Sequence, residues 1–233
     1  MNEKSIIFDE YNTDETVNLY NDFTYNIGLL GAEKYILQKY AHKEDKLLDA
    51  CCGAGRTAIG TYSLGFTNIV GVDICESMIA AAKINTRQLG YDISYKCCDI
   101  LEMNEFEFDF ISFWFNSLMV VPTQAYRSAI LSRCIKNLSP NGIIVITAPV
   151  MPSDYDFEKE LDQFSQKGYS FLFEYGDRIF DDVCFIHFPT EMEIDQYFTG
   201  LKLLESNLLD NVYQQTGRGR SLSYEGKFWV YRR

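Results

Sequence analysis

Residues 47–56 read LLDACCGAGR, an apolar strand pattern that runs into a glycine turn and then into a helical pattern. Gly53 and Gly55 supply the tight backbone that such a turn requires. A turn without side chains also lets a ligand lie against the amino end of the following helix. Asp73 ends the next apolar run, 18 residues after Gly55, where a carboxylate can accept hydrogen bonds from both hydroxyls of a ribose. The stretch therefore indicates a site for a nucleotide-type cofactor.

The glycine pair alone does not identify that cofactor. Residues 53–58, GAGRTA, also fit the looser dinucleotide pattern G-x-G-x-x-A, which keeps a nicotinamide oxidoreductase open. Asp49 favours a different ligand, because an acid beside the turn faces a pyrophosphate unfavourably and suits a ligand that presents an ammonium group.

Outward from this stretch, short apolar runs alternate with helical patterns. The runs predict strands over residues 46–51, 68–73, 93–97, 108–115 and 143–148. The patterns between them predict helices over residues 56–64, 76–89 and 123–138. Such alternation favours right-handed crossovers and parallel pairing. The sequence predicts an α/β fold with a doubly wound, mostly parallel seven-stranded sheet of Rossmann-like type and helices on both faces.

The two ends of the chain depart from that alternation. Residues 16–41 predict one or two helices broken near Gly28 and Gly31. After the fifth strand, we expect helices over 154–167 and 190–198, and strands over 169–175, 183–188, 202–208 and 227–231. The 233 residues are thus expected to form one domain. Its parts are an N-terminal helical lid (1–45), a cofactor-binding core (46–150), a substrate-covering insertion (151–200) and closing strands (201–233).

Composition and charge exclude several classes of protein. Hydrophobic residues make up 47% and charged residues 23%, which fits a folded, soluble chain. The net charge of -12 repels phosphate backbones and anionic lipid surfaces. No apolar run reaches the length of a transmembrane helix, and residues 1–5 lead into no signal-peptide core. We expect a cytoplasmic protein with no nucleic-acid partner and no membrane contact.

Seven cysteines include two adjacent pairs, Cys51-Cys52 and Cys97-Cys98. The odd count and the lack of a C-x-x-C motif argue against a disulfide framework and against a zinc site. A soft metal on an adjacent pair stays open, although each pair lies where a buried strand would end. The prediction is reduced, mostly buried thiols and no metal site.

Five motifs, in order across residues 46–148, resemble the class I S-adenosylmethionine-dependent methyltransferases. The first motif of that family reads apolar, apolar, acid, x, Gly, Cys, Gly, x, Gly. Asp49, Cys52, Gly53 and Gly55 match it, and Cys51 stands where the family has its first glycine. Residues 71–82, GVDICESMIAAA, resemble the family's ribose-binding strand and helix. Residues 98–100, 109–118 and 139–146 resemble the motifs around its third, fourth and fifth strands.

The resemblance implies S-adenosyl-L-methionine as cofactor and assigns roles to single residues. It implies that Asp73 holds the ribose and that Asp99 with Ile100 receives the adenine. The implied cofactor-binding residues are Asp49, Cys51, Gly53, Ala54, Gly55, Asp73, Ile74, Met78, Asp99, Ile100, Asn116, Tyr11 and Tyr25. Taken singly, Asp73 also fits a helix cap, Asp99 a turn, and Met78 a core position.

Methyl transfer requires alignment and exclusion of water rather than a catalytic triad, and no triad is visible in the sequence. His187 has the side chain of a general base near neutral pH, although its alternation with phenylalanines also fits a structural histidine. Tyr11, Tyr20 and Tyr25 precede the first motif, where related enzymes carry a lid. A ring face there can stabilise a sulfonium. His187 and Tyr20 are the candidate catalytic residues.

The fourth motif helps to predict the class of methyl acceptor. Residues 115–118 read FNSL and lack the Asn-Pro-Pro-aromatic pattern usual in methyltransferases of nucleic-acid bases. With the acidic balance, this favours a small-molecule acceptor that attacks through oxygen or nitrogen. A protein or RNA acceptor, and a non-catalytic protein that binds S-adenosylmethionine, stay open. Residues 1–22 have a net charge of -5 and residues 154–195 a net charge of -9, so we hypothesise an acidic, aromatic cover that favours a cationic acceptor.

Overall fold

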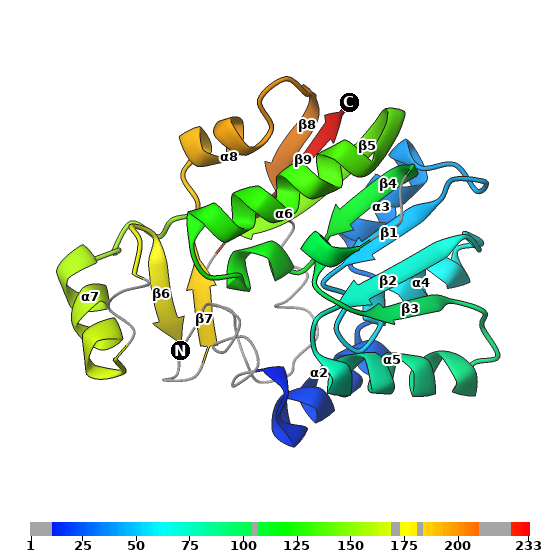
Figure 1. Ribbon diagram of the computed structural model, residues 1–233, viewed down its shortest axis with the longest axis horizontal. Coiled ribbons are helices and arrows are strands. Elements are labelled where there is room, and N and C mark those ends of the chain that lie inside the picture. The colour runs from blue at the N-terminus through cyan, green and yellow to red at the C-terminus, as the bar shows by residue number, and fades with distance from the viewer. Residues whose placement is uncertain (1–10, 104–106, 169–172, 181–183, 210–224) are drawn as a thin grey trace.

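The computed structural model describes residues 11–103, 107–168, 173–180, 184–209 and 225–233, and is built around one seven-stranded sheet (Figure 1). The order of the strands is β3-β2-β1-β4-β5-β9-β8. Their bounds are β1 Leu47–Ala50, β2 Ile69–Asp73, β3 Ser94–Cys97, β4 Phe108–Phe113, β5 Leu138–Pro149, β8 Lys202–Leu208 and β9 Gly226–Arg232. Strands β1 to β5 pair in parallel, and β9 runs antiparallel to both β5 and β8. The predicted mostly parallel seven-stranded sheet is confirmed.

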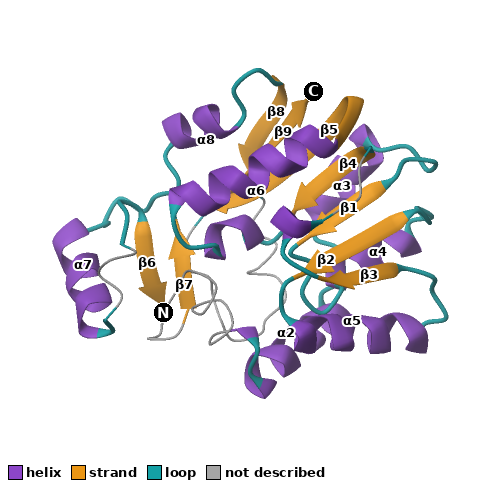
Figure 2. Ribbon diagram, viewed as in Figure 1, coloured by secondary structure: helices purple, strands orange, loops and turns teal. Residues whose placement is uncertain are grey.

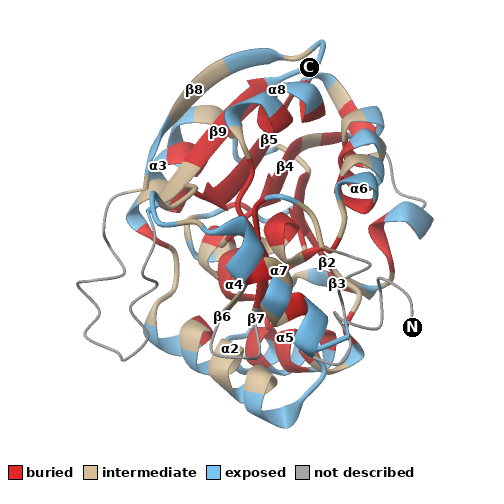
Figure 3. Ribbon diagram, turned by 90° about the vertical axis from the view of Figure 1, so that its left-hand side faces the viewer, coloured by how far each residue is buried: buried red, intermediate tan, exposed pale blue. Residues whose placement is uncertain are grey.

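Helices cover both faces of the sheet (Figure 2). Their bounds are α2 Asp14–Asn26, α3 Gly31–Tyr40, α4 Arg56–Ser63, α5 Glu76–Gln88, α6 Gln124–Asn137, α7 Phe157–Gln166 and α8 Glu191–Tyr197, with short 3-10 helices η1 Ile100–Glu102 and η2 Ser117–Val120. Alternate strand residues face two cores: Ile144 and Ile146 pack with α6 and α8, whereas Ile143 and Val145 pack with α3 and α4. Buried positions accordingly concentrate on β4, β5 and β9 (Figure 3).

The N-terminal helices dock beside the first βα unit. The predicted break near Gly28 is confirmed, since α2 ends at Asn26 and Gly28 has a φ of +61°. The Asn85 side chain on α5 donates to the Asn21 side-chain oxygen on α2 (2.9 Å), and Tyr25 donates to Asn85 (2.9 Å). These bonds hold α2 next to the edge of the sheet where β1, β2 and β3 end (Figure 1).

The insertion after β5 contains α7, a hairpin of β6 (Asp177–Phe180) with β7 (Cys184–His187), and α8. The predicted strand over 169–175 is wrong in its described part, because residues 173–176 form a loop and turn and β6 starts only at Asp177. The Asp177 carboxylate accepts the Glu174 N–H (2.8 Å), and the Asp177 N–H donates to the Glu174 carbonyl (3.0 Å). This turn, with Gly176 at a φ of +100°, takes the chain out of an extended conformation. Residues 169–172 lie outside the described residues.

The fifth strand begins earlier than the predicted residue 143. β5 starts at Leu138, directly after α6, and its pairing with β4 shifts register between Phe108 and Phe110. Asn141, at a φ of +66°, allows this irregular start. Among the described residues, the helices lack the combined length and apolar character that crossing a membrane requires.

Candidate active site

A cavity opens where the loops after β1, β2, β3 and β4 meet helix α2. Its lining comes from the 49–57 loop, from the ends of β2 and β3, from the segment after β4, and from α2 and α6. Of the residues predicted to bind cofactor or to act in catalysis, those that line the cavity are Tyr11, Tyr20, Asp49, Cys51, Gly53, Ala54, Asp73, Ile74, Met78, Asp99 and Ile100. Ligands commonly bind outside the carboxyl ends of the strands in open α/β sheets.

The glycine loop has the backbone that the sequence indicates. Gly53 and Gly55 have φ values of +51° and +87°, and Gly55 caps the amino end of α4. A Cβ on Gly55 would lie 2.7 Å from the Tyr95 hydroxyl, so close packing also requires a glycine there. Gly55 supports the loop but does not itself line the cavity, whereas Gly53 lies under the Tyr20 ring.

Cys51 takes a conformation that glycine adopts more easily. Its φ is +57°, in the left-handed region, at the position where the resembled motif has a glycine. Burial raises the pKa of the Cys51 thiol well above its ordinary value, with the charge of Asp73 adding to the effect. The thiol is therefore held protonated, and a nucleophilic role is disfavoured.

Asp73 joins the glycine loop to the start of α5. Its two carboxylate oxygens accept the Gly53 N–H (2.8 Å) and the Cys75 N–H (2.9 Å). Burial raises the pKa of Asp73, while these backbone donors act in the opposite direction. The carboxylate is thus fixed in orientation at the wall of the cavity, at the end of β2.

Asp49 is a buried acid of the cavity wall, with 5% of its surface exposed. Its carboxylate accepts the Thr57 hydroxyl (2.6 Å). Burial raises the pKa of Asp49 to about 7, against the opposing effects of Thr57 and Arg56. The nearby Arg56 does not neutralise it fully, because its guanidinium is bound bidentately by Glu33 at 2.8 and 2.6 Å. A cationic ligand group at this end of the cavity would favour the ionised form of Asp49.

Asp99 lies at the opposite side, after β3. Its carboxylate accepts the Leu101 N–H (2.9 Å) and the Tyr126 hydroxyl (2.8 Å). Ile74, Met78 and Ile100 provide apolar surface in the same cavity. Tyr126 lies on α6, and the sequence analysis missed it because only the tertiary structure brings α6 against η1.

Aromatic side chains form the wall between α2 and the segment after β4. Ring centroids follow at 6.1 Å for Tyr11 and Tyr20, 5.7 Å for Tyr20 and Phe23, and 5.7 Å for Phe23 and Phe115. The Arg56 guanidinium lies 5.0 Å from the Phe115 ring centre. Phe23 and Phe115 are further lining residues that sequence reasoning missed; Phe23 follows Tyr20 by three residues, which is the spacing of one helix face.

Besides Gly55, three candidate residues are absent from the cavity lining, although Asn116 lies between two residues that line it, Phe115 and Ser117. Tyr25 is 54% exposed, and its hydroxyl donates to Asn85 and to Gln88 (2.5 Å). Asn116 is buried, and its N–H donates to the Thr147 hydroxyl (2.9 Å). His187 is 1% exposed and belongs to a cluster of buried charges in the insertion. None of these three residues therefore forms part of the cavity wall.

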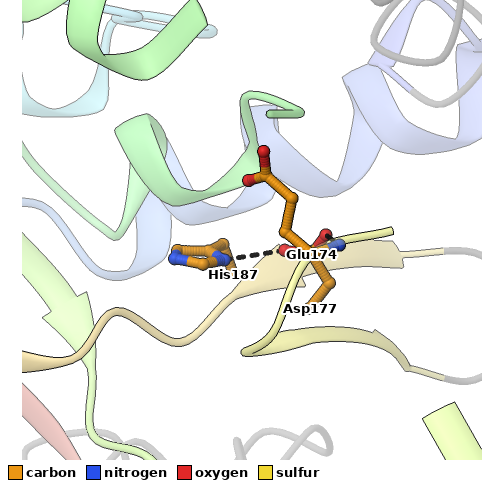
Figure 4. Close-up of side chains that lie close together, drawn as sticks. All are labelled: Glu174, Asp177 and His187. Carbon is orange, nitrogen blue, oxygen red and sulfur yellow. Dashed lines mark hydrogen bonds and ion pairs between the residues drawn. The ribbon is translucent and has the colours of Figure 1, made fainter. Parts of the chain in front are cut away.

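His187 lies in a buried cluster of charged side chains. The imidazole contacts the Asp177 carboxylate through Nδ1 (2.7 Å) and the Glu193 carboxylate through Nε2 (2.8 Å). Glu174, Asp177 and His187 also bring three metal-ligating atoms within 4.8 Å of one another (Figure 4). Arg127 already binds Glu174 (2.9 Å) and Glu193 (3.3 Å), so a guanidinium supplies the positive charge that a cation would otherwise supply.

The cluster also changes how the net negative charge of residues 154–195 is interpreted. Asp177, Glu193 and Glu160 are almost fully buried and pair with His187, Arg127 and Arg178. A share of the net charge of residues 154–195 is therefore compensated inside the fold, rather than presented to a ligand.

Comparisons with known proteins agree with this arrangement. Residues 41–194 match the family model described as "Methyltransferase domain". The ubiquinone biosynthesis O-methyltransferase of Bradyrhizobium sp. strain ORS 278 is 36% identical over 103 residues, which is 44% of this chain and 39% of that protein. The ribosomal protein L11 methyltransferase of Thermotoga petrophila is 34% identical over 77 residues, which is 33% of this chain and 29% of that protein. The similarity to these curated relatives thus spans less than half of their length.

The fold has close counterparts among solved structures. A crystal structure described as a SAM-dependent methyltransferase from Methanosarcina mazei superposes with a TM-score of 0.70 at 18% sequence identity. The match covers 89% of this chain and 99% of that one. At this identity the likeness concerns the fold.

Proposed function

Because this chain belongs to the methyltransferase domain family, we propose that it binds S-adenosyl-L-methionine in the cavity and transfers its methyl group to a small-molecule acceptor. One observation carries the proposal: Asp49, Asp73 and Asp99 lie at the ends of three neighbouring strands and face one cavity beside the glycine loop. The first suits an ammonium group, the second a ribose and the third an adenine.

The side chains divide the cavity into two ends for this cofactor. Asp49 would bind the amino group of the methionine part, and the glycine turn would allow the backbone to approach it. Asp73 would accept hydrogen bonds from the ribose hydroxyls. At the other end Asp99, held by Tyr126, would receive the adenine, with Ile74, Met78 and Ile100 packed against the ring.

When bound, S-adenosylmethionine would supply an electrophilic methyl group, which the acceptor atom would take while sulfur keeps the electron pair of the broken carbon–sulfur bond and the acceptor proton leaves to solvent or to a base. The protein must hold the acceptor in line and keep water out. Tyr11, Tyr20, Phe23 and Phe115 form a wall suited to this task, since aromatic rings exclude water and their faces attract a cation.

Tyr20 is the better candidate for an acid–base role, because it lines the cavity and His187 does not. His187 has both ring nitrogens bound to carboxylates and is almost fully buried, so it has no route to an acceptor proton without rearrangement of the insertion. We therefore propose a structural role for His187.

The acceptor separates two versions of the proposal. The ubiquinone biosynthesis relative and the net charge of -12 support a small acceptor, whereas the ribosomal protein methyltransferase relative favours a protein acceptor as the second candidate. The acidic cover over a cationic acceptor has weaker support than the composition suggests, because several of these acids are paired inside the fold.

The test is transfer of a labelled methyl group. Purified protein would be incubated with methyl-labelled S-adenosylmethionine and with either a small-metabolite or a protein fraction of a cell extract. We expect label in the metabolite fraction; label in protein only would favour the second candidate. The Asp73→Ala variant should lose transfer, and the exposed Asp195→Asn variant should keep it. Cofactor binding without transfer to any fraction would indicate a non-catalytic binding protein.

A further inference from the structure

Arg127 is a fully buried cation that the proposed function does not use directly. It lies on α6 with 0% of its surface exposed. Its guanidinium donates to the Val121 carbonyl (3.0 Å), the Tyr197 hydroxyl (3.0 Å), Glu174 (2.9 Å) and Glu193 (3.3 Å). One side chain thus connects the start of α6 with α8 and with the turn before β6.

The α6 side of this connection is part of the cavity wall. Val121 and Tyr126 both line the cavity, and Tyr126 is the neighbour of Arg127 in the sequence. The Tyr126 hydroxyl donates to Asp99, the acid proposed for the adenine end. The position of Arg127 therefore affects the positions of Val121 and Tyr126, two residues of the cavity wall.

The other side of the connection is the insertion. Glu174 accepts both the Arg127 guanidinium and the Gln124 N–H (2.6 Å) in the first turn of α6. Figure 4 shows Glu174 extending from the turn before β6 toward α6. Behind it, His187 bridges Asp177 on β6 and Glu193 on α8, so the bonded groups belong to a continuous network.

None of the described residues of 151–200 lines the cavity, so an influence of the insertion on the cofactor would pass through residues of the cavity wall. β7 packs against η2, whose Ser117 and Val120 line the cavity, and Arg127 bonds both to the wall residue Val121 and to Glu174 of the insertion. A planar guanidinium suits this role because it binds several acceptors in fixed directions, whereas a lysine ammonium does not.

We propose that Arg127 and Glu174 are positioning residues that couple the insertion to the adenine end of the cofactor cavity. They act through Val121 and Tyr126 and do not touch the cofactor. This inference rests on the proposed function, since it takes the Asp99 end of the cavity as the adenine site. Through this coupling, the insertion would affect the affinity for the cofactor without lining the cavity.

The test uses Glu174, because replacement of the fully buried Arg127 would remove the guanidinium from the buried Glu193 as well as from Glu174 and would strongly destabilise the fold. The Glu174 side chain is 33% exposed, and after Glu174→Ala the buried Arg127 keeps its ion pair with Glu193. We expect the dissociation constant of S-adenosylhomocysteine to rise about tenfold, within the usual range of coupling between sites. Glu174→Gln, which keeps an acceptor oxygen, should recover most of the affinity. The matched control is Glu191→Ala, an exposed acid on α8 paired with Lys227, which should bind like wild type.

Two readouts separate positioning from a general loss of stability. The affinity for 5′-methylthioadenosine, which lacks the amino acid part, should fall by the same factor, because the altered wall is at the adenine end. In a double-mutant cycle with Tyr126→Phe, the second substitution should cost little once the first is present. Additive losses would show that Glu174 does not act through Tyr126 and would overturn the inference.

The outcomes also distinguish this inference from the proposed function. If wild type fails to bind S-adenosylhomocysteine, the proposed function is wrong. If wild type binds and Glu174→Ala binds equally well, the proposed function stands and the positioning role is refuted. If Glu174→Ala loses affinity for S-adenosylhomocysteine alone, the effect is not at the adenine end and the inference is likewise refuted.

Discussion

The raised pKa of Asp49 predicts that the affinity for the cofactor increases with pH. Burial raises its pKa to about 7 in the empty cavity, and a bound ammonium group should hold it ionised. Below pH 7, binding must therefore release a proton. With a pKa of about 7, roughly one molecule in eleven has an ionised Asp49 at pH 6 and roughly ten in eleven at pH 8, so the affinity should rise about tenfold between these pH values.

Calorimetry with S-adenosylhomocysteine in buffers of different ionisation enthalpy measures this proton directly. We expect release of about 0.9 proton at pH 6 and about 0.1 at pH 8. Asp73 also has a raised pKa, so 5′-methylthioadenosine serves as the matched ligand without an ammonium group. The difference between the two ligands isolates Asp49, and Asp49→Asn should remove it. Equal pH dependence for both ligands in wild type would refute the role of Asp49.

Further predictions concern stability. Asp49→Asn should stabilise the ligand-free protein by up to about 4 kcal/mol at pH 8 and by less than half of that at pH 5, because the native pKa of about 7 exceeds the ordinary 3.8 and the cost of ionising the buried carboxyl grows as the pH rises from 3.8 to 7; chemical denaturation at both pH values tests it. Cys51→Gly should be nearly neutral and Cys51→Val should cost about 1–3 kcal/mol, because a β-branched residue is strained at a φ of +57°; equal unfolding midpoints would contradict this. Glu33→Gln should cost about 3–5 kcal/mol by leaving Arg56 buried without its carboxylate, and a loss below 1 kcal/mol would show that the pair is dispensable. Burial lowers the pKa of His187, but the hydrogen-bonded carboxylates of Asp177 and Glu193 outweigh it and leave the pKa raised. The stabilisation from the charged imidazole is therefore complete below pH 6.5 and is lost as the pH rises through the native pKa; thermal unfolding of His187→Gln should lack this loss, and the same decline in the variant would exclude His187 as its cause.

The acids of the cavity could be predicted because each is tied to a local pattern. Asp49 and Asp73 end apolar runs that form β1 and β2, and Asp99 follows β3, so the parallel sheet brings them to one edge. The partners of these acids were harder to predict. Tyr126 reaches Asp99 from 27 residues away along the chain, a contact that depends on how α6 packs.

Tyr25 and His187 show that residue type alone does not predict where a side chain lies. Tyr25 follows Tyr20 by five residues on α2, which turns it about 140° around the helix, away from the cavity and toward α5. His187 alternates with buried phenylalanines as a strand residue should, but the sequence does not reveal that Asp177 and Glu193 occupy both ring nitrogens. Both outcomes depend on tertiary contacts.

Titration of the purified protein with S-adenosylhomocysteine measures cofactor binding itself. We expect saturable binding at one site per chain, with at least a tenfold loss in Asp73→Ala and no comparable binding of NAD. Tighter binding of NAD, or S-adenosylhomocysteine binding that the loss of Asp73 leaves unchanged, would contradict this expectation.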